Sequence, residues 1–444
     1  MPVTRTPPDP GFGRIAVLRA YPRDPLAVLS EAFRRSGDVA SFMLGPQRMW
    51  AVHDPGLIGQ VLTSRATAFH RGRLMHAARA LLGDGLLTSE EPLHQRQRRL
   101  VQPSLTRERT SLLASPLADM AEAHAARWPR GLAFDAVPAL RRVALDAVAG
   151  VLFGGTLGDA EAERVATALT DATPLFRVLS LPLAGHLLHT PLPFARRFRR
   201  ARHDIDTVVL RLIADRRASS EAGDDLLSAL LHASDVDGGM SDAQLRDEAV
   251  TLFLAGHETT ANALAWSVYL LARSPDAQER LANEARSVLG DGPIDPAHAE
   301  RLTYCGQVIA EALRLYPPAW ILLRRAVTSV ELGPYRVGAG DAVVTALPLL
   351  HRHPAIWHEP DRFDPERFDP RGTPLPRYAY LPFGAGPRAC IGRRLALLEA
   401  RIALATIARR FRVRPANTAA VPADLRFTLR PGAPINIVLE ERSA

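Results

Sequence analysis

Cysteine is scarce in this chain of 444 residues, and lysine is absent. The two cysteines, Cys305 and Cys390, are too few for the disulfide framework that small secreted domains use. We therefore expect a protein of a reducing compartment, the cytoplasm. All 55 basic residues are arginines, which together with the many alanines we interpret as the codon bias of a GC-rich bacterium.

Aromatic residues are also few, at 6% of the chain. The formal net charge is +8 and the isoelectric point is about 10.2, a balance that raises the question of nucleic-acid binding. The arginines are scattered in short clusters along helical stretches, however, without interleaved aromatic residues or a known binding motif. We expect no nucleic-acid partner, and we interpret a basic face as better suited to an acidic protein.

The N-terminus, MPVTRTPPDPGFGR, has no apolar run. We therefore expect neither a signal peptide nor a membrane anchor, and residues 1–20 are predicted to be loosely ordered. The composition is otherwise globular, with 47% hydrophobic and 23% charged residues, enough for a large core. A soluble protein is the expectation.

Helical patterns dominate from about residue 92 to 316. Short strands are predicted at VASFMLG and RMWAVHD, which Gly45–Pro46 separates, and within ELGPYRVGAGDAVVTAL. Residues 351–382 are irregular and rich in proline, and a last long helix follows as IGRRLALLEARIALATIARRF. Because no repeat or linker divides the chain, we predict one domain over residues 1–444, mainly α with a small β part, and a monomer.

One predicted helix is much longer than the others. Ser241 and Gln244 fit a capping box, and the helical pattern then continues to Pro275. At the usual rise per residue, such a helix spans on the order of 48 Å. Polar HETT stands at its centre, which excludes a membrane span. The pattern therefore predicts a core helix that crosses the whole molecule.

The stretch FGAGPRACIG, residues 383–392, surrounds Cys390 with glycines. A zinc site would need further ligands at short spacing, which this stretch lacks. The glycine pattern is a weak match to a dinucleotide-binding turn, but Pro387 stands where the helix should begin and no acidic residue follows about twenty positions on. The stretch is therefore interpreted as a tight loop that holds a lone thiolate, as a ligand or a nucleophile.

Three stretches, in this order along the chain, resemble one known family. Residues 255–260, AGHETT, fit A-G-x-E-T-T, and Glu311 with Arg314 fits a helical E-x-x-R. The third stretch fits F-x-x-G-x-R-x-C-x-G through Phe383, Gly386, Arg388, Cys390 and Gly392. Over roughly residues 20 to 440, the chain resembles the cytochrome P-450 superfamily of haem-thiolate monooxygenases, in its soluble bacterial form.

The resemblance implies the cytochrome P-450 fold, with haem b between the long central helix and the last long helix. Cys390 is then the axial ligand of the iron, in a loop where Phe383, Gly384 and Gly392 also lie against the cofactor. Glu311, Arg314 and Arg367 of a P-E-R-F segment are implied to form a structural group. Cys305 has no such loop and is expected to be an inert core thiol.

For catalysis, the resemblance points to Glu258 and Thr259 of the long helix. Thr259 is expected to hydrogen-bond the oxygen that is being reduced, while Glu258 admits protons from solvent. Gly256 and Thr259 are expected to weaken the helix locally and to leave a bulge in which Ala255 borders the haem. His257 occupies the variable position of the motif and receives no role.

Arginine and histidine are expected to bind the haem propionates. The candidates are Arg388 beside the ligand, His94 and Arg98 four residues apart in HQRQRRL, and Arg324, which is preferred to Arg325. The surplus arginines are either a docking face or ordinary solvated charge; they are Arg96, Arg99, Arg393, Arg394 and Arg401. His351, His353 and His358 lie close together in LHRHPAIWHEP, which we interpret as a structural stretch and not as a metal site.

The implied reaction inserts one oxygen atom from O2 into an organic substrate. The chain has no convincing flavin or iron–sulfur segment, so electrons are expected from a separate ferredoxin and ferredoxin reductase. Apolar stretches at LFRVLSLPLAGHLL, AVTLFLAG and AWILL favour a neutral hydrophobic substrate. The surroundings of HQRQRRLVQPSL and RLYPPAWILLRRA resemble terpene-oxidising members, which points to a sesquiterpene-like terpenoid.

Several alternatives stay open from the sequence. Within the family these are a fatty-acid hydroxylase, a polyketide hydroxylase and a peroxide-using peroxygenase, the last disfavoured by Glu258 and Thr259. A haem-thiolate isomerase or dehydratase would need no reductant. A haem sensor would oxidise nothing and would not need the acid and the alcohol.

Overall fold

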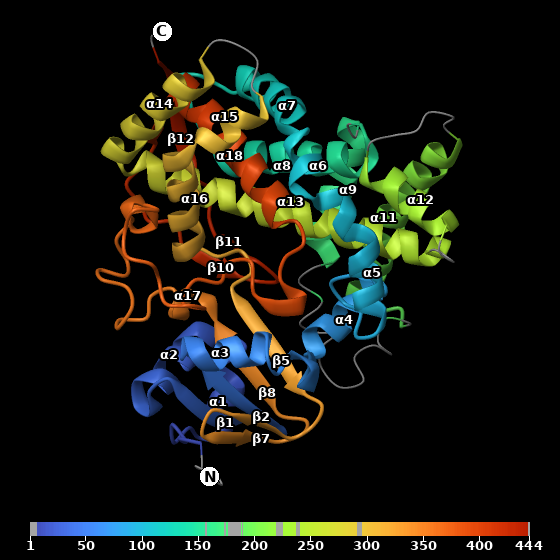
Figure 1. Ribbon diagram of the computed structural model, residues 1–444, viewed down its shortest axis with the longest axis vertical. Helices are drawn as coiled ribbons and strands as arrows, with labels where there is room; N and C mark the ends of the chain where they lie inside the picture. The colour runs from blue at the N-terminus through green and yellow to red at the C-terminus, as the bar shows by residue number, and fades with distance from the viewer. Residues whose placement is uncertain are drawn as a thin grey trace. The chain divides into compact units, whose positions relative to one another are not determined.

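The computed structural model describes residues 7–155, 158–172, 175, 188, 190–218, 225–236, 240–290 and 295–442. The chain divides into two compact units. The smaller unit comprises residues 1–72, 313–363 and 370–390, and the larger comprises residues 73–312, 364–369 and 391–444. Figure 1 labels their helices and strands.

A five-stranded sheet of order β1-β2-β8-β5-β3 forms the centre of the smaller unit. Its strands are β1 Val39–Leu44, β2 Gln47–Val52, β3 Phe69–Arg71, β5 Ile321–Ala326 and β8 Ala342–Ala346. Gly45 and Pro46 join β1 to antiparallel β2, and Gly45 has a φ of +61°, which suits a two-residue hairpin turn. The two strands predicted from the sequence, and the break at Gly45–Pro46 between them, are confirmed, and the structure shows that the strands pair.

Four helices lie beside this sheet in the smaller unit (Figure 1). They are α1 Arg14–Ala20, α2 Pro25–Ser36, α3 Pro55–Leu62 and α17 Leu347–Leu350. Asp24 caps α2 by accepting from the Ala27 N–H at 2.9 Å, and Asp54 caps α3 from the Leu57 N–H at 2.7 Å. In both helices a proline follows the cap, where a missing N–H costs nothing. A separate hairpin pairs β6 Val330–Leu332 with β7 Tyr335–Val337.

The larger unit is almost entirely helical. Its helices are α4 Arg73–Leu82, α5 Leu93–Val101, α6 Arg107–Ser111, α7 Ala114–Arg127, α8 Ala136–Phe153, α9 Asp159–Ala172, α11 Pro193–Ala218, α12 Leu226–Val236, α13 Asp242–Ala272, α14 Pro275–Leu289, α15 Pro296–Arg301, α16 Thr303–Leu315 and α18 Arg393–Arg410. The last three residues of α16 belong to the smaller unit. Short strands complete the larger unit: β4 Ala133–Asp135, β9 Phe411–Pro415, β10 Ala423–Leu425, β11 Leu429–Pro431 and β12 Asn436–Glu441.

Helix α13 is the long core helix that the sequence predicted. It has 31 residues, and Ser241 with Gln244 forms the expected capping box at its start. It packs against α8 and α18 within the larger unit. Leu264 and Trp266 are fully enclosed, and the helix is buried on nearly all sides along its second half. Burial all round is typical of a helix in the middle of a core rather than on a surface.

Mainly helical structure with a small β part is confirmed. Among the helices that the structure describes, none is both long enough and apolar enough to cross a bilayer. Segment 7–20, which the sequence predicted to be loosely ordered, contains α1.

Candidate active site

Residues 383–390 form a closed loop in the smaller unit, and this loop ends at Cys390. The Cys390 N–H donates to the Phe383 carbonyl oxygen at 2.9 Å, around a short turn at Gly386–Arg388. Gly386 has a φ of +71°, and a Cβ at this position would collide with the carbonyl oxygen of Leu62. Only glycine fits there. The loop is thus closed by its own backbone, and Cys390 is exposed at its end.

The two cysteines have opposite surroundings. Cys305 on α16 is fully buried, its thiol lies 3.5 Å from the Arg401 carbonyl oxygen, and burial raises its pKa well above the usual range. A buried thiol with a raised pKa stays protonated and is a poor ligand. Neither cysteine forms a disulfide. Cys390 is therefore the sulfur suited to coordinate a metal.

Helix α13 is opened at its centre. Ala255 is exposed, and Glu258 and Thr259 are half-buried, whereas no other residue of the helix after Ala243 is exposed. The Thr259 hydroxyl donates to the Ala255 carbonyl oxygen at 2.6 Å. The expected bulge does not interrupt the helix, which is α-helical from Asp242 to Ala272. Residues 255–259 therefore differ from the following part of α13 in the exposure of Ala255, which is also the acceptor of the Thr259 hydroxyl.

Gly256 has a packing role in the same stretch. A Cβ on Gly256 would lie 2.6 Å from the Val148 side chain of α8, so the glycine lets the two helices approach closely. We had expected this glycine to weaken the helix; the structure instead uses it for contact between α8 and α13. His257 is buried beside Phe253, and burial lowers its pKa to about 3. It is therefore neutral at ordinary pH.

The Glu258 side chain has a defined partner outside its own helix. Its Oε1 accepts a hydrogen bond from the Thr428 hydroxyl at 2.6 Å. Thr428 lies at the tip of the β10–β11 hairpin and accepts in turn from Asn262 Nδ2 at 3.1 Å. The Glu258 carboxylate is therefore hydrogen-bonded to one hydroxyl group, that of Thr428, and Glu258 precedes Thr259 in the chain. Carboxylates and hydroxyl groups are the kinds of group that proton transfer uses.

The E-x-x-R residues lie at the end of α16 and are both fully buried. In the larger unit, Glu311 accepts from the Asp364 N–H at 2.9 Å, and Arg367 Nε lies 3.4 Å from Glu311 Oε1. The carboxylate therefore holds the P-E-R-F segment, which forms the short turn Pro365–Phe368. A buried charge pair of this kind is costly to break from one side.

In the smaller unit, Arg314 holds an irregular segment together. Its guanidinium donates to the carbonyl oxygens of His351 at 2.9 Å, Pro360 at 2.6 Å and Arg362 at 3.1 Å. His351 is also fully buried, and its Nε2 accepts from the Leu381 N–H at 2.9 Å. Because Leu381 stands two residues before the cysteine loop, Arg314 and His351 together fix the base of that loop.

The candidate propionate ligands are distributed over both units. In the larger unit, His94 and Arg98 share one face of α5, and His94 Nδ1 lies 2.8 Å from Glu91 Oε1. In the smaller unit, Arg324 is half-buried on β5 whereas Arg325 is exposed, because successive residues of a strand face opposite sides. Arg388 is half-buried in the turn before Cys390.

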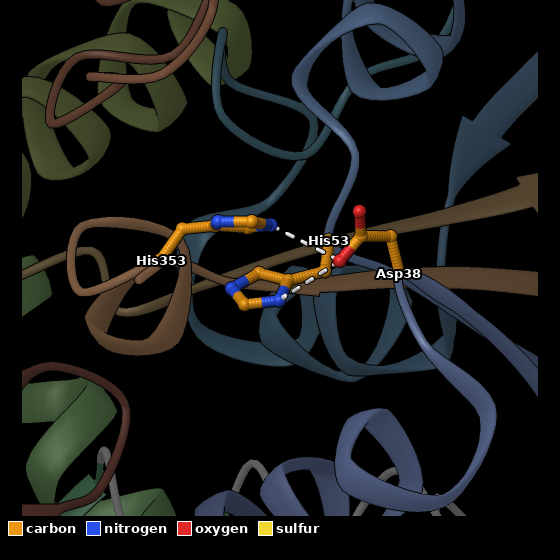
Figure 2. A group of neighbouring side chains, drawn as sticks. All are labelled: Asp38, His53 and His353. Carbon is orange, nitrogen blue, oxygen red and sulfur yellow. Dashed lines mark hydrogen bonds and ion pairs between the residues drawn. The ribbon is translucent and has the colours of Figure 1, made fainter. Parts of the chain in front are cut away.

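One group of side chains could be taken for a metal site. Figure 2 shows Asp38, His53 and His353 facing one another in the smaller unit. His353 Nδ1 accepts from the Ala355 N–H at 3.2 Å, so its Nε2 carries the proton and donates to Asp38 at 3.0 Å. A metal ligand would need a lone pair on that Nε2. The arrangement is therefore a hydrogen-bonded one, and His351 and the exposed His358 are not part of it.

Comparison with known proteins identifies the family of this chain. The family model described as Cytochrome P450 matches residues 5–437. This chain belongs to the cytochrome P450 family. It is 35% identical over 425 residues to cyclooctatin synthase of Streptomyces melanosporofaciens, covering 95% of this chain and 92% of that protein.

Two further relatives are similar over most of their length. Pentalenene oxygenase of Streptomyces avermitilis is 35% identical over 419 residues, 92% of this chain and 93% of that protein. Cyclooctat-9-en-7-ol 5-monooxygenase of Streptomyces melanosporofaciens is 34% identical over 399 residues, 88% of this chain and 86% of that protein. The chain is accordingly a cytochrome P450 monooxygenase, and the family predicted from its three motifs is confirmed.

The residues fit the haem-thiolate cofactor that this family implies. An exposed cysteine ends a loop in which Gly386 cannot be replaced without a clash, and α13 is accessible at Ala255 in its middle. Histidine and arginine side chains suited to anionic propionates lie on α5, on β5 and before Cys390. The residue types in each unit are therefore compatible with the haem-thiolate cofactor that the family implies.

The sequence analysis did not predict that Thr428 and Asn262 support Glu258, or that His351 supports the cysteine loop. No motif marks them, because each acts through a partner that is distant along the chain; Thr428 and Glu258 are 170 residues apart. The hairpin tip, Arg426–Thr428, contains no Gly, Pro, Asn or Asp, so no local signal marks it.

Proposed function

We propose that this cytochrome P450 uses haem b, with Cys390 as its axial ligand, to insert one oxygen atom from O2 into a neutral terpenoid of sesquiterpene-like size. The observation that carries the substrate class is the similarity of nearly the whole chain to pentalenene oxygenase and to cyclooctatin synthase.

Apolar stretches support a substrate without charge. Residues 249–256 of α13 and residues 319–323 before and within β5 carry no charged side chain. The third apolar stretch, LFRVLSLPLAGHLL, lies mostly outside the described residues. A pocket with apolar walls binds a hydrocarbon skeleton through burial of its surface, and few polar groups are needed to orient it.

The cysteine loop would hold the cofactor. A thiolate-ligated haem supplies the oxygen activation, because the thiolate pushes electron density that favours O–O cleavage. Cys390 holds the sulfur at the end of its closed loop, with Phe383, Gly384 and Gly392 beside it. His94, Arg98, Arg324 and Arg388 bind the two propionates through charge-assisted hydrogen bonds.

Glu258 and Thr259 would move the protons. Reduction of O2 with insertion of one oxygen atom releases the other as water, which requires two protons. Glu258 receives a proton from solvent at its carboxylate and passes it toward the Thr259 hydroxyl. Thr259 Oγ1, now bonded to the Ala255 carbonyl oxygen at 2.6 Å, turns from that oxygen to donate at the reacting centre.

Electrons would come from a ferredoxin served by a ferredoxin reductase. A small acidic protein suits a chain of net charge +8. Arg96, Arg99, Arg393 and Arg394 are exposed, and Arg401 is half-buried, so the first four lie at the surface where such a partner would bind. We place the reaction in the cytoplasm, where Cys390 stays reduced, and take the working form as a monomer.

Glu258 and Thr259 favour this reaction over that of a peroxygenase, which takes peroxide directly and has less need of proton delivery. Turnover with ferredoxin, reductase and O2 should exceed turnover with peroxide alone. The reverse result would assign the chain to peroxygenases.

The substrate class is tested by optical titration of the purified ferric protein with sesquiterpenes, fatty acids and macrolide-like compounds. A shift of the main haem band toward the high-spin form is expected with the terpenes. A response only to fatty acids or polyketide-like compounds would replace the terpenoid by that class. A protein that takes up no haem would overturn the role of Cys390.

A further inference from the structure

The Glu258 carboxylate is held by a segment that no motif marks. Thr428 donates its hydroxyl proton to Glu258 Oε1 at 2.6 Å, and Asn262 Nδ2 donates to the Thr428 oxygen at 3.1 Å. Asn262 and Thr428 are only 2% and 4% exposed. The three side chains therefore form a directed chain of hydrogen bonds, from the buried amide through the hydroxyl to the carboxylate.

The β10–β11 hairpin is built to keep Thr428 in place. Asp424 accepts from Arg426 Nε at 2.7 Å and from Arg430 Nε at 3.2 Å, one on each side of the tip. The Arg426 N–H donates to the Thr428 carbonyl oxygen at 3.1 Å, which closes the tip. Phe427 packs against the large apolar core cluster, which contains Phe253 and Leu254 of α13. The tip is thus anchored to the helix that carries Glu258.

A second group competes for the same carboxylate. Arg141 on α8 is electrostatically attracted to Glu258, although no direct ion pair joins them among the contacts described. Without the Thr428 hydroxyl, the carboxylate would be drawn toward this arginine. The observed position of Glu258 is the one bonded to the hairpin, and the Thr428 hydroxyl is the hydrogen-bond donor that holds it there.

We propose that Thr428, supported by Asn262, is a positioning residue for proton delivery: it fixes the position of the Glu258 carboxylate and makes that position depend on the β10–β11 hairpin. This inference rests on the proposed role of Glu258. Displacement of the hairpin tip would move the carboxylate with it, because one hydrogen bond joins the two.

The test uses the haem-loaded enzyme with ferredoxin and reductase. Thr428→Val removes the hydroxyl and keeps the shape, Thr428→Ser keeps the hydroxyl, and Thr418→Val makes the same change at an exposed threonine. In Thr428→Val we expect the fraction of electrons recovered in product to fall roughly fivefold and the solvent deuterium isotope effect to rise roughly twofold. Thr428→Ser should restore both, and Thr418→Val should change neither.

A second readout does not depend on turnover. Hydrogen exchange of the amides in residues 425–430 should accelerate roughly tenfold when either partner of the bond is removed, in Thr428→Val or in Glu258→Ala. In the double variant the acceleration should be no larger than in the single ones, because both changes remove the same bond. If the accelerations of the two single variants added up in the double variant, the hydrogen bond between Thr428 and Glu258 would not be what connects the hairpin to the carboxylate.

The two proposals can fail separately. If Glu258→Gln keeps the wild-type electron recovery and isotope effect, the role of Glu258 fails and the inference with it. If Glu258→Gln alters both and Thr428→Val alters neither, only the inference is overturned. Should Thr428→Val fold poorly, Asn262→Leu removes the supporting donor and should shift both quantities in the same direction by a smaller factor.

Discussion

The Thr259 hydroxyl donates to the carbonyl oxygen of Ala255, one turn earlier in α13, at a distance of 2.6 Å. This bond occupies the only proton of the hydroxyl at the point where Ala255 is exposed. The helix is held by its backbone N–H groups, that of Thr259 included, and the side-chain bond is an addition to these. The helix therefore loses little stability when the Thr259 side chain turns away from Ala255. We therefore predict that the Thr259 hydroxyl can exchange this bond for one to the reacting oxygen, and that its loss has a specific consequence.

Thr259→Ala should separate oxygen consumption from product formation. Without the hydroxyl, protons reach the reacting oxygen less selectively, and we expect product per electron to fall about tenfold with a matching rise in peroxide. Product, peroxide and consumed electron donor measured in one reaction check this. Thr260→Ala is the control, since Thr260 is the neighbouring buried threonine; equal coupling in Thr259→Ala and wild type would remove Thr259 from the mechanism.

Cys390→Ser should abolish the optical spectrum of a thiolate-ligated haem, whereas Cys305→Ala should keep it. The reason is the difference in surroundings: Cys390 is exposed at the end of its loop, and burial raises the pKa of the Cys305 thiol. The carbon monoxide difference spectrum of the reduced proteins measures the outcome. A thiolate spectrum that survives in Cys390→Ser would refute the ligand assignment.

Arg314→Lys should destabilise the protein severely. Arg314 is fully buried, donates to three carbonyl oxygens and lies 5.0 Å from the centre of the Trp357 ring. A lysine cannot span these acceptors in the same geometry, and we expect a loss of about 3–5 kcal/mol in the free energy of unfolding. Denaturant unfolding compares this variant with Arg336→Lys, which changes an exposed arginine and should cost little.

Glu248 on α13 should make stability depend on pH. It is fully buried, accepts from the Leu86 N–H at 3.0 Å, and burial raises its pKa from 4.5 to about 7. Between these two values the folded state keeps a proton that the unfolded chain releases. The contribution of this group to the free energy of unfolding is therefore fully present below pH 4.5 and is lost as the pH rises to about 7.

Glu248→Gln removes this dependence. The free energy of unfolding of the variant minus that of wild type should increase by about 3 kcal/mol as the pH rises from about 5 to about 8. The reason is that wild type loses the contribution of Glu248 over this range, and one pKa unit corresponds to about 1.4 kcal/mol. Denaturant unfolding of both proteins at the two pH values gives the difference, and Glu331→Gln serves as the exposed control. A constant gap between Glu248→Gln and wild type across this range would contradict the raised pKa.

Local chemistry explains which elements were predictable. The capping box of Ser241 and Gln244 and the turn at Gly45–Pro46 are signals within a few residues, and both were confirmed. Helices α2 and α3 were missed, although Asp24 and Asp54 stand before prolines as typical caps, because each helix is short and lies next to a strand. The apolar residues of these two helices become understandable only in the folded unit, where they pack against the sheet.

The sequence by itself determined the family, because the three motifs encode chemistry that acts locally: a cysteine in a loop that needs glycine, an acid beside an alcohol, and a helical pair. Only the tertiary structure decided what holds these groups. The partner of Glu258 comes from a hairpin 170 residues away, and Arg314 binds carbonyl oxygens 37 to 48 residues along the chain. Such contacts depend on how distant segments pack, which no local pattern of residues specifies.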